Sequence, residues 1–261
     1  MRKKIISVVC FLLAVFVSHG IAADSAPFFF LQLSDPQFGF MDNNKSISAE
    51  TEAMNKAVTA INQLKPPFVV ITGDFVNNSK NKEQIAAYKS MIAQIDSSVK
   101  VYMIPGNHDI GKVSRASIDN YKKNYGETHF SFRYGDCAFI GIDSNIIKEE
   151  DKEREEVQFK WLEQELQKTK DARFKFVFTH CSVFLKRMDE PVNYSNFSLP
   201  MREKYVYGGP AMESLGTGTN GGRLFIFTVG SDWRGKFDYL NAYPYRAVTY
   251  ATQKIIRQSN A

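Results

Sequence analysis

The sequence predicts an α/β fold (α+β by some schemes), in which two β-sheets form a sandwich flanked by helices. Short apolar runs alternate with amphipathic segments, and each run ends in a polar loop. This alternation is typical of mostly parallel sheets, because parallel strands are joined by crossover helices that cover the sheet. A chain of 261 residues with 44% hydrophobic and 23% charged side chains is long enough and apolar enough for one such domain.

Strands and helices are predicted to alternate over the first half of the chain. Residues 28–33, 68–72 and 101–104 are apolar runs that predict buried strands. Between them, residues 50–64 and 82–95 carry apolar side chains at helical spacing. Ligands of such sheets bind at the carboxyl ends of the strands, so the polar loops that follow the strands are candidate sites.

A second sheet is predicted from the second half of the chain. Residues 130–133 and 138–143 flank a short turn and predict a β-hairpin. A helix is expected over residues 155–168, followed by a strand over residues 174–179. Two further β-like segments come later, at residues 224–229 and 246–250.

The N-terminus predicts a signal peptide over residues 1–23, followed by one domain over residues 24–261. Three basic residues within the first four positions precede an apolar run over residues 5–17. That run is too short for a comfortable membrane span, although a single-pass anchor is the alternative. We therefore expect a secreted or periplasmic protein with no stable membrane span in the mature chain.

Charge and cysteine content exclude some classes of partner. Of the 33 basic residues, three lie in the predicted signal peptide, which leaves 30 against 28 acidic residues. This near-neutral balance gives no reason to expect nucleic-acid binding. Cys137 and Cys181 both lie in apolar contexts and are interpreted as small core side chains, with a disulfide between them as the alternative.

Metal-type ligands follow four of the predicted strands. Each segment alone is a common turn, but the four together, in order and each at a strand end, indicate a metal site. Carboxylate, amide and imidazole groups in combination suit Mn, Fe or Zn better than Ca or Cu. The segments are Ser34-Asp35-Pro36-Gln37, Gly73-Asp74-Phe75-Val76-Asn77, Gly106-Asn107-His108-Asp109 and Thr179-His180.

These segments resemble the calcineurin-like metallophosphoesterase family. The pattern of that family is Asp-x-His, Gly-Asp-x-x-Asp/Asn, Gly-Asn-His-Asp/Glu, a lone His and finally Gly-His-x-His. The resemblance runs from about Phe28 to Val206, and the Asp-Pro-Gln start is similar to one subgroup. It implies a sandwich of the metallophosphoesterase type and two divalent metal ions (Mn, Fe or Zn).

The resemblance also implies a role for each matching residue. Asp35 would bind a first metal together with Gln37, which stands where the family more often has His. Asn107 and His180 would bind a second metal, and Asp74 would bridge the two.

Two further residues would act on the substrate side. His108 would face the phosphate and donate a proton to the leaving oxygen, while Asp109 would orient His108.

The Gly-His-x-His motif is missing from this chain. The sequence has 4 histidines, and none follows His180. The helix that begins near Met201 is followed too soon by Tyr207-Gly208-Gly209, so there is no room for a further helical stretch and strand. We hypothesise an internal deletion of about 20 residues, one helix–strand unit, at the Val206–Tyr207 junction.

Three functions remain open on the sequence alone. The first is a metal-dependent phosphoesterase that hydrolyses phosphate esters with a metal-activated water. The second is a catalytically impaired relative that lacks the Gly-His-x-His ligands and binds phosphate-bearing ligands weakly. The third is a non-enzymatic surface binding module, suggested by aromatic residues near the C-terminus such as Trp233 and Tyr243. The identity of the ester is not encoded in these motifs.

Overall fold

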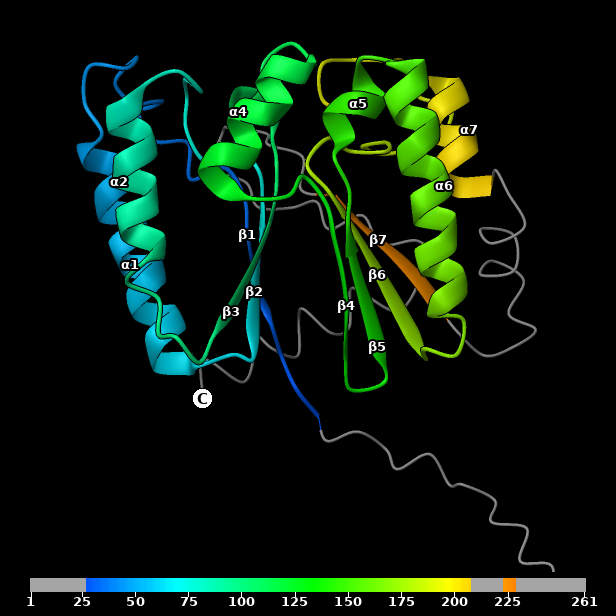
Figure 1. Ribbon diagram of the computed structural model, residues 1–261, viewed down its shortest axis with the longest axis horizontal. Coiled ribbons are helices and arrows are strands. Elements are labelled where there is room, and N and C mark those ends of the chain that lie inside the picture. The colour runs from blue at the N-terminus through cyan, green and yellow to red at the C-terminus, as the bar shows by residue number, and fades with distance from the viewer. Residues whose placement is uncertain (1–26, 208–222, 229–261) are drawn as a thin grey trace, which may run out of the picture.

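The computed structural model describes residues 27–207 and 223–228 of the chain. Two sheets lie face to face in the middle of the molecule, and helices cover the outer face of each sheet (Figure 1). This arrangement is the predicted sandwich with flanking helices. Within these residues, no helix is long and apolar enough to cross a membrane.

The first sheet has three parallel strands in the order β1-β2-β3. Its strands are β1 (Leu31–Leu33), β2 (Phe68–Thr72) and β3 (Lys100–Ile104). The connecting helices α1 (Ser48–Leu64) and α2 (Lys82–Ile92) lie together on its outer face (Figure 1). All five residues of β2 are buried, because this central strand has a neighbour on each edge and packs on both faces.

The second sheet has four strands in the order β4-β5-β6-β7. The β4–β5 hairpin is antiparallel, whereas the β5–β6 and β6–β7 pairs are parallel. Helix α6 precedes β6 along the chain and α7 follows it, and both cover the outer face of this sheet (Figure 1). These elements are β4 (Phe130–Tyr134), β5 (Cys137–Gly141), α6 (Lys152–Lys168), β6 (Phe174–Thr179), α7 (Leu199–Tyr207) and β7 (Arg223–Thr228).

Three further helices were not expected from the sequence. They are α3 (Asn107–Ile110), α4 (Arg115–Tyr125) and α5 (Ser144–Lys148). Helix α4 packs Ile118, Tyr121 and Tyr125 against the core, but only Tyr121 is fully buried, so its apolar stripe is narrow and was overlooked. Helix α3 is a single turn and begins inside a segment interpreted as a loop. Helix α3 follows the carboxyl end of β3, where a candidate ligand also lies, α4 follows α3, and α5 follows the carboxyl end of β5.

Aromatic side chains fill the space between the two sheets. The Phe68 ring lies 4.8 Å from the Phe139 ring, and Phe139 stacks on Phe176 at 4.9 Å. Phe30 adds a stacked contact with Phe68 at 5.1 Å. Large rings bury much apolar area with few rotatable bonds, so this layer fixes the distance between the sheets and therefore between the loops at their ends.

The predicted strands and longer helices are present, apart from those outside the described residues, but β1 and β3 are mostly half-buried, whereas buried strands were predicted. The expected strand at 246–250 and the signal peptide at 1–23 lie outside them. Helix α7 and the parallel strand β7 occupy the next positions after β6, so β6 has a neighbour on each edge. Residues 208–222 between α7 and β7 are not described, and the missing helix–strand unit near residues 206–207 stays a prediction.

Candidate metal centre

The loops that follow β1 and β2 are joined by backbone hydrogen bonds beyond the ends of the strands. The Asp35 N–H donates to the Gly73 carbonyl at 3.1 Å, and the Gln37 N–H donates to the Asp74 carbonyl at 2.8 Å. Phe38 continues the pairing with Phe75 at 3.1 Å. The parallel register of the sheet therefore carries over into the loops and places Asp35 beside Asp74.

Three of the predicted ligand residues have left-handed backbone conformations. Their φ angles are 54° for Asp35, 37° for Gln37 and 52° for Asp74. Residues with a side chain rarely adopt this region, and such strain persists only where the surrounding structure imposes it. The interlocked loops impose it here, so the fold holds these side chains at the end of the sheet at a cost in backbone strain.

Gly106 allows the loop after β3 to approach Asp74 closely. A Cβ atom at Gly106 would lie 2.1 Å from Asp74 Oδ1 and 2.3 Å from Asp74 N. Without that atom, the His108 N–H at the start of α3 donates to Asp74 Oδ1 at 2.8 Å. The glycine therefore brings the Gly-Asn-His-Asp segment against the Asp74 carboxylate.

His180 reaches the same place from the second sheet. Its Nδ1 lies 2.8 Å from the Thr72 carbonyl, a contact that requires a proton on Nδ1. The neutral ring then presents a lone pair on Nε2, which lies 3.0 Å from Asn107 Oδ1 and 3.6 Å from Asp74 Oδ2. Three acceptor atoms thus converge, and either a proton or a metal cation must lie among them.

Charge among these groups supports a cation at this point. Burial by itself would lower the pKa of His180, but Asp74, Asp35 and the Thr72 carbonyl together raise it above its ordinary value. Asp35 Oδ1 is buried and has no hydrogen-bond partner among the described residues. Candidate ligand atoms of Asp35, Asp74 and His180 all lie within 4.8 Å of one another. The donor set therefore fits a divalent cation.

Burial also changes the acidity of the Asp35 carboxyl. Its pKa rises to about 6, because loss of solvent and the nearby Asp74 carboxylate outweigh the attraction of His180. The Ser34 hydroxyl donates to the other oxygen of the same carboxylate. A bound cation would favour the ionised form of Asp35 and would take the place of the missing partner.

Asn107 is held by a contact with a residue that is distant along the chain. Its Nδ2 donates to the Tyr194 hydroxyl at 2.7 Å, while its Oδ1 lies beside His180 Nε2. The amide therefore presents its oxygen, the atom that can bind a metal, to the centre.

His108 lies at the edge of the centre and is oriented by a backbone group. Its Nδ1 lies 2.9 Å from the Asn77 carbonyl, which fixes the proton on Nδ1 and leaves Nε2 available. This contact corrects the role predicted for Asp109. The Asp109 carboxylate is buried and accepts hydrogen bonds from the N–H groups of Gly106 at 2.9 Å and Phe75 at 2.8 Å. Asp109 therefore joins the loops after β2 and β3, and Asn77 orients His108.

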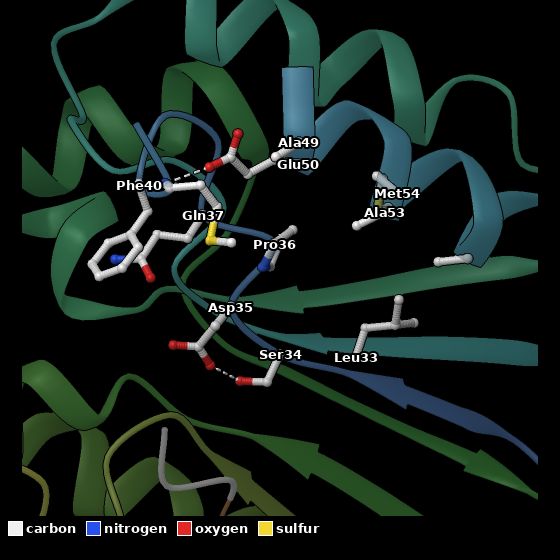
Figure 2. A pocket seen from close by; sticks show the side chains of 12 residues that line it. Leu33, Ser34, Asp35, Pro36, Gln37, Phe40, Ala49, Glu50, Ala53 and Met54 are labelled. Atoms are coloured by element: carbon white, nitrogen blue, oxygen red, sulfur yellow. Dashed lines mark hydrogen bonds between the residues drawn. The ribbon is translucent and has the colours of Figure 1, made fainter. Parts of the chain in front are cut away.

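Gln37 is buried beside the centre, and an apolar cavity of about 280 Å³ adjoins it. The Gln37 Nε2 lies 3.4 Å from Asn77 Oδ1. Figure 2 shows that the Asp35 carboxylate, with the Ser34 hydroxyl beside it, points away from the α1 side chains. The cavity therefore offers apolar space behind the ligand loop, lined by Leu33, Ser34, Asp35, Pro36, Gln37, Phe40, Met41, Ala49, Glu50, Ala53, Met54 and Ala57.

A family model for calcineurin-like phosphoesterases matches residues 30–227. The chain belongs to the calcineurin-like phosphoesterase family. The match includes all the residues of the candidate centre, from Asp35 to His180. The predicted family is therefore confirmed.

Named relatives agree with this assignment. A protein from Rattus norvegicus named serine/threonine-protein phosphatase CPPED1 is 30% identical over 200 residues, which cover 69% of this chain and 64% of that protein. The Homo sapiens protein of the same name is 29% identical over 222 residues, covering 76% of this chain and 71% of that protein. The chain thus spans about two thirds of these relatives' length. A dimetal phosphatase structure from Danio rerio is similar over 60% of this chain and 70% of that one, with 15% identity and a TM-score of 0.45.

The structure brings together five of the residues that the sequence singled out. Asp35, Asp74, Asn107 and His180 surround one point, and His108 lies beside it. Sequence reasoning missed Tyr194, because no motif or spacing links it to Asn107, 87 residues away along the chain. Cys137 and Cys181 are buried and free, as expected for core side chains.

Proposed function

We propose that this chain hydrolyses phosphate esters with two divalent cations held at the carboxyl ends of β1, β2, β3 and β6. The observation that carries the proposal is the convergence of His180 Nε2, Asn107 Oδ1 and the Asp74 carboxylate, all acceptors, at one point. Membership of the family and the phosphatase names of the relatives support the same chemistry.

The ligands divide into two sets. Asp35 and Gln37 would hold one cation, Asn107 and His180 would hold the other, and Asp74 would contact both. Bound cations would supply Lewis acidity that activates a water and offsets charge on the phosphoryl oxygens.

His108 acts on the substrate side of this arrangement. Because the Asn77 carbonyl holds the proton on Nδ1, Nε2 is the atom that meets the substrate. When protonated, Nε2 donates a hydrogen bond to a phosphoryl or leaving-group oxygen and can transfer its proton to an alcohol that departs. The His108 main-chain N–H donates a hydrogen bond to Asp74 Oδ1 at 2.8 Å, which holds the His108 backbone beside this candidate ligand.

A second candidate is a catalytically impaired relative that binds phosphate-bearing ligands weakly. The observation in its favour is the absence of any histidine after His180 in the sequence. Each cation then has three predicted protein ligands, and water would complete the coordination. Weak metal binding with no turnover is the expected behaviour of this candidate.

Hydrolysis of p-nitrophenyl phosphate with added Mn²⁺ tests the proposal. The comparison is between the wild type, Asp74→Asn and a matched control, Asp171→Asn. Asp171 is exposed and lies before β6, at the end of that strand opposite to His180. Bound metal should be measured on the same samples by inductively coupled plasma mass spectrometry.

The proposal expects EDTA-sensitive hydrolysis that Asp74→Asn reduces by about 100-fold or more, because both cations lose a ligand. Asp171→Asn should match the wild type. Full activity of Asp74→Asn with an unchanged circular dichroism spectrum would contradict the proposal. Metal binding by the wild type without turnover would favour the impaired relative.

We also propose that the mature chain is secreted or periplasmic. The support is the basic and apolar N-terminal pattern over residues 1–23. A fusion of these residues to alkaline phosphatase, which is active only after export in bacteria, should give colonies with phosphatase activity. The same fusion with the apolar run over residues 5–17 deleted should give none, and equal activity of both would contradict the proposal.

A further inference from the structure

An exposed tyrosine lies over the candidate metal centre and contacts one of its ligands. The Tyr194 side chain belongs to the segment between β6 and α7 and is 73% exposed. Its hydroxyl nevertheless accepts a hydrogen bond from Asn107 Nδ2 at 2.7 Å. The two residues are 87 positions apart, so the contact joins the loop after β3 to the segment between β6 and α7.

The loop that carries Tyr194, defined here as the 188–197 loop, is fixed from below by a buried arginine. Arg202 has no exposed surface and donates to the carbonyls of Met188 at 2.8 Å, Glu190 at 2.7 Å and Phe197 at 2.7 Å. A guanidinium that bonds to three carbonyls of one loop restricts the loop to a single shape.

Two further polar groups hold the residues next to Tyr194. Lys148 Nζ donates to the carbonyl of Asn193 at 2.6 Å and also to that of Asn196. The Asn196 side chain is buried, accepts from the Asn193 N–H at 2.8 Å and donates to Glu190 Oε1 at 2.7 Å. The residues on both sides of the tyrosine are thus tied down, although its own ring is open to solvent. These hydrogen bonds hold the Tyr194 hydroxyl at a defined position.

The contact gives the Asn107 amide nitrogen an acceptor in the orientation that turns the amide oxygen toward the centre. An amide has nearly the same shape after a half-turn, so packing alone distinguishes oxygen from nitrogen poorly. Only the oxygen can bind a cation, and the NH₂ group in its place would put two positive donors against the metal. The hydroxyl of Tyr194 accepts from Nδ2 and so leaves Oδ1 turned toward His180 Nε2 at 3.0 Å.

We propose that Tyr194 is a positioning residue that holds the Asn107 amide with its oxygen toward the metal. The inference rests on the proposed function, because it assigns Asn107 as a metal ligand. Tyr194 itself does not bind the metal in this scheme. Arg202 and Lys148 hold the 188–197 loop, and the loop in turn fixes the position of the tyrosine hydroxyl relative to Asn107.

Calorimetric titration of the metal-free chain with MnCl₂ tests the inference without any need for turnover. Tyr194→Phe keeps the ring and removes only the hydroxyl, so it should weaken Mn²⁺ binding about 10-fold, as is typical when the outer partner of a metal ligand is lost. The matched control is Val192→Ala in the same loop, an exposed side chain at 57%, which should bind Mn²⁺ like the wild type. The melting temperatures of both variants should equal that of the wild type, because both side chains are exposed.

A second comparison separates positioning from direct action of the tyrosine. In an Asn107→Asp chain both side-chain oxygens can bind metal, so there is no amide left to orient. Tyr194→Phe should then change Mn²⁺ affinity by about twofold or less, in contrast to its effect beside Asn107. An equal loss in both backgrounds would show that the effect of Tyr194 does not depend on the orientation of the amide and would overturn the inference.

The failure of this inference can be distinguished from the failure of the proposed function. If the wild type binds Mn²⁺ and Tyr194→Phe binds it equally well, only the positioning role is wrong. If the wild type binds no Mn²⁺, the metal-dependent function is wrong and the positioning role is overturned with it.

Discussion

The two sheets contribute to the candidate metal centre in different ways. The first sheet supplies Asp35, Asp74 and Asn107 from the ends of three successive parallel strands, over one continuous interlocked surface. The second sheet supplies His180 from the end of β6. Strand β7 lies beside β6 in parallel, yet the 33 residues that follow Thr228 contain no histidine. The second sheet therefore extends beyond β6, but the sequence after β7 offers no further histidine as a ligand.

The difference follows from what holds each side in place. On the first side, backbone hydrogen bonds such as Asp35 N–H to Gly73 O position the ligands, and strained φ angles aim them. On the second side, the buried Arg202 and the half-buried Lys148 hold the 188–197 loop through hydrogen bonds to its carbonyls. The first arrangement depends on glycine and on close backbone approach, and the second depends on individual side chains. Substitutions can test the two sides separately.

The largest effect is expected for Gly106→Ala, on the first side. The new Cβ would lie 2.1 Å from Asp74 Oδ1, and the backbone on both sides is fixed. We expect the free energy of unfolding to fall by about 3 kcal/mol or more, with loss of Mn²⁺ binding. Urea denaturation and calorimetric Mn²⁺ titration measure the two effects.

The matched control for this change is Gly111→Ala. Gly111 has a φ of 64°, but its Cβ would meet nothing within 4 Å. The cost should be about 1 kcal/mol, from backbone strain alone, with Mn²⁺ binding retained. Equal costs at the two glycines would mean that close approach to Asp74 is not what requires Gly106.

A slightly smaller effect is expected for Arg202→Met, on the second side. The change leaves the carbonyls of Met188, Glu190 and Phe197 without their common donor in a buried place. Such groups each cost free energy when unpaired, so we expect a loss of about 2–3 kcal/mol in the free energy of unfolding. Urea denaturation measures it.

The control for Arg202 is Arg187→Ala in the neighbouring segment. Arg187 forms an ion pair with Asp189. The Arg187 side chain is 73% exposed and the Asp189 side chain is 65% exposed. Exposed pairs contribute about 0–1 kcal/mol, so this variant should unfold nearly like the wild type. If Arg202→Met lowers the free energy of unfolding as little as Arg187→Ala does, Arg202 does not hold the 188–197 loop, and Tyr194 is not rigidly supported by it.

Much of the first side could be predicted from the sequence, because its ligands follow contiguous apolar runs. Asp35, Asp74 and Asn107 each lie in the short segment that follows a strand, and parallel strands bring their carboxyl ends to one edge. His180 follows the same rule at the end of β6. Short local patterns therefore predicted most of the fold and placed the candidate ligands at the ends of its strands.

Contacts made by loops and by main-chain groups could not be predicted in this way. The tie between Tyr194 and Asn107 depends on the path of a loop, and no periodicity encodes it. The Asn77 carbonyl that orients His108 is a main-chain atom, which any residue would supply. Helix α4 was missed although Ile118, Tyr121 and Tyr125 have helical spacing, because polar residues surround this narrow stripe.

The smallest expected effect concerns Asp143, a buried carboxylate that follows β5 on the second side. Its Oδ1 accepts from the Asn145 N–H at 2.9 Å, while Oδ2 is buried with no partner among the described residues. Like Asp35 it is deprived of solvent, and burial raises its pKa to about 6. Unlike Asp35, it does not share the convergence of ligands around Asp74.

The sign of the resulting pH dependence follows from that shift. Between the unfolded pKa of about 4 and the folded pKa of about 6, the folded state binds the proton more tightly, so the stability contributed by Asp143 falls as pH rises. Asp143→Asn keeps the acceptor at the start of α5 and removes the charge. In EDTA, its advantage over the wild type in the free energy of unfolding should widen by about 2 kcal/mol from pH 4 to pH 8.

The exposed Asp171 gives the opposite expectation and makes the test of Asp143 specific. Two hydrogen bonds from Arg133 hold the Asp171 pKa below its ordinary value, so Asp171→Asn should lose ground to the wild type as pH rises. If the advantage of Asp143→Asn were constant across the same range, the Asp143 carboxyl would titrate as it does in the unfolded chain. The second side would then tolerate a buried charge without a cation, and an unpaired carboxylate oxygen such as Asp35 Oδ1 would no longer count in favour of a metal on the first side.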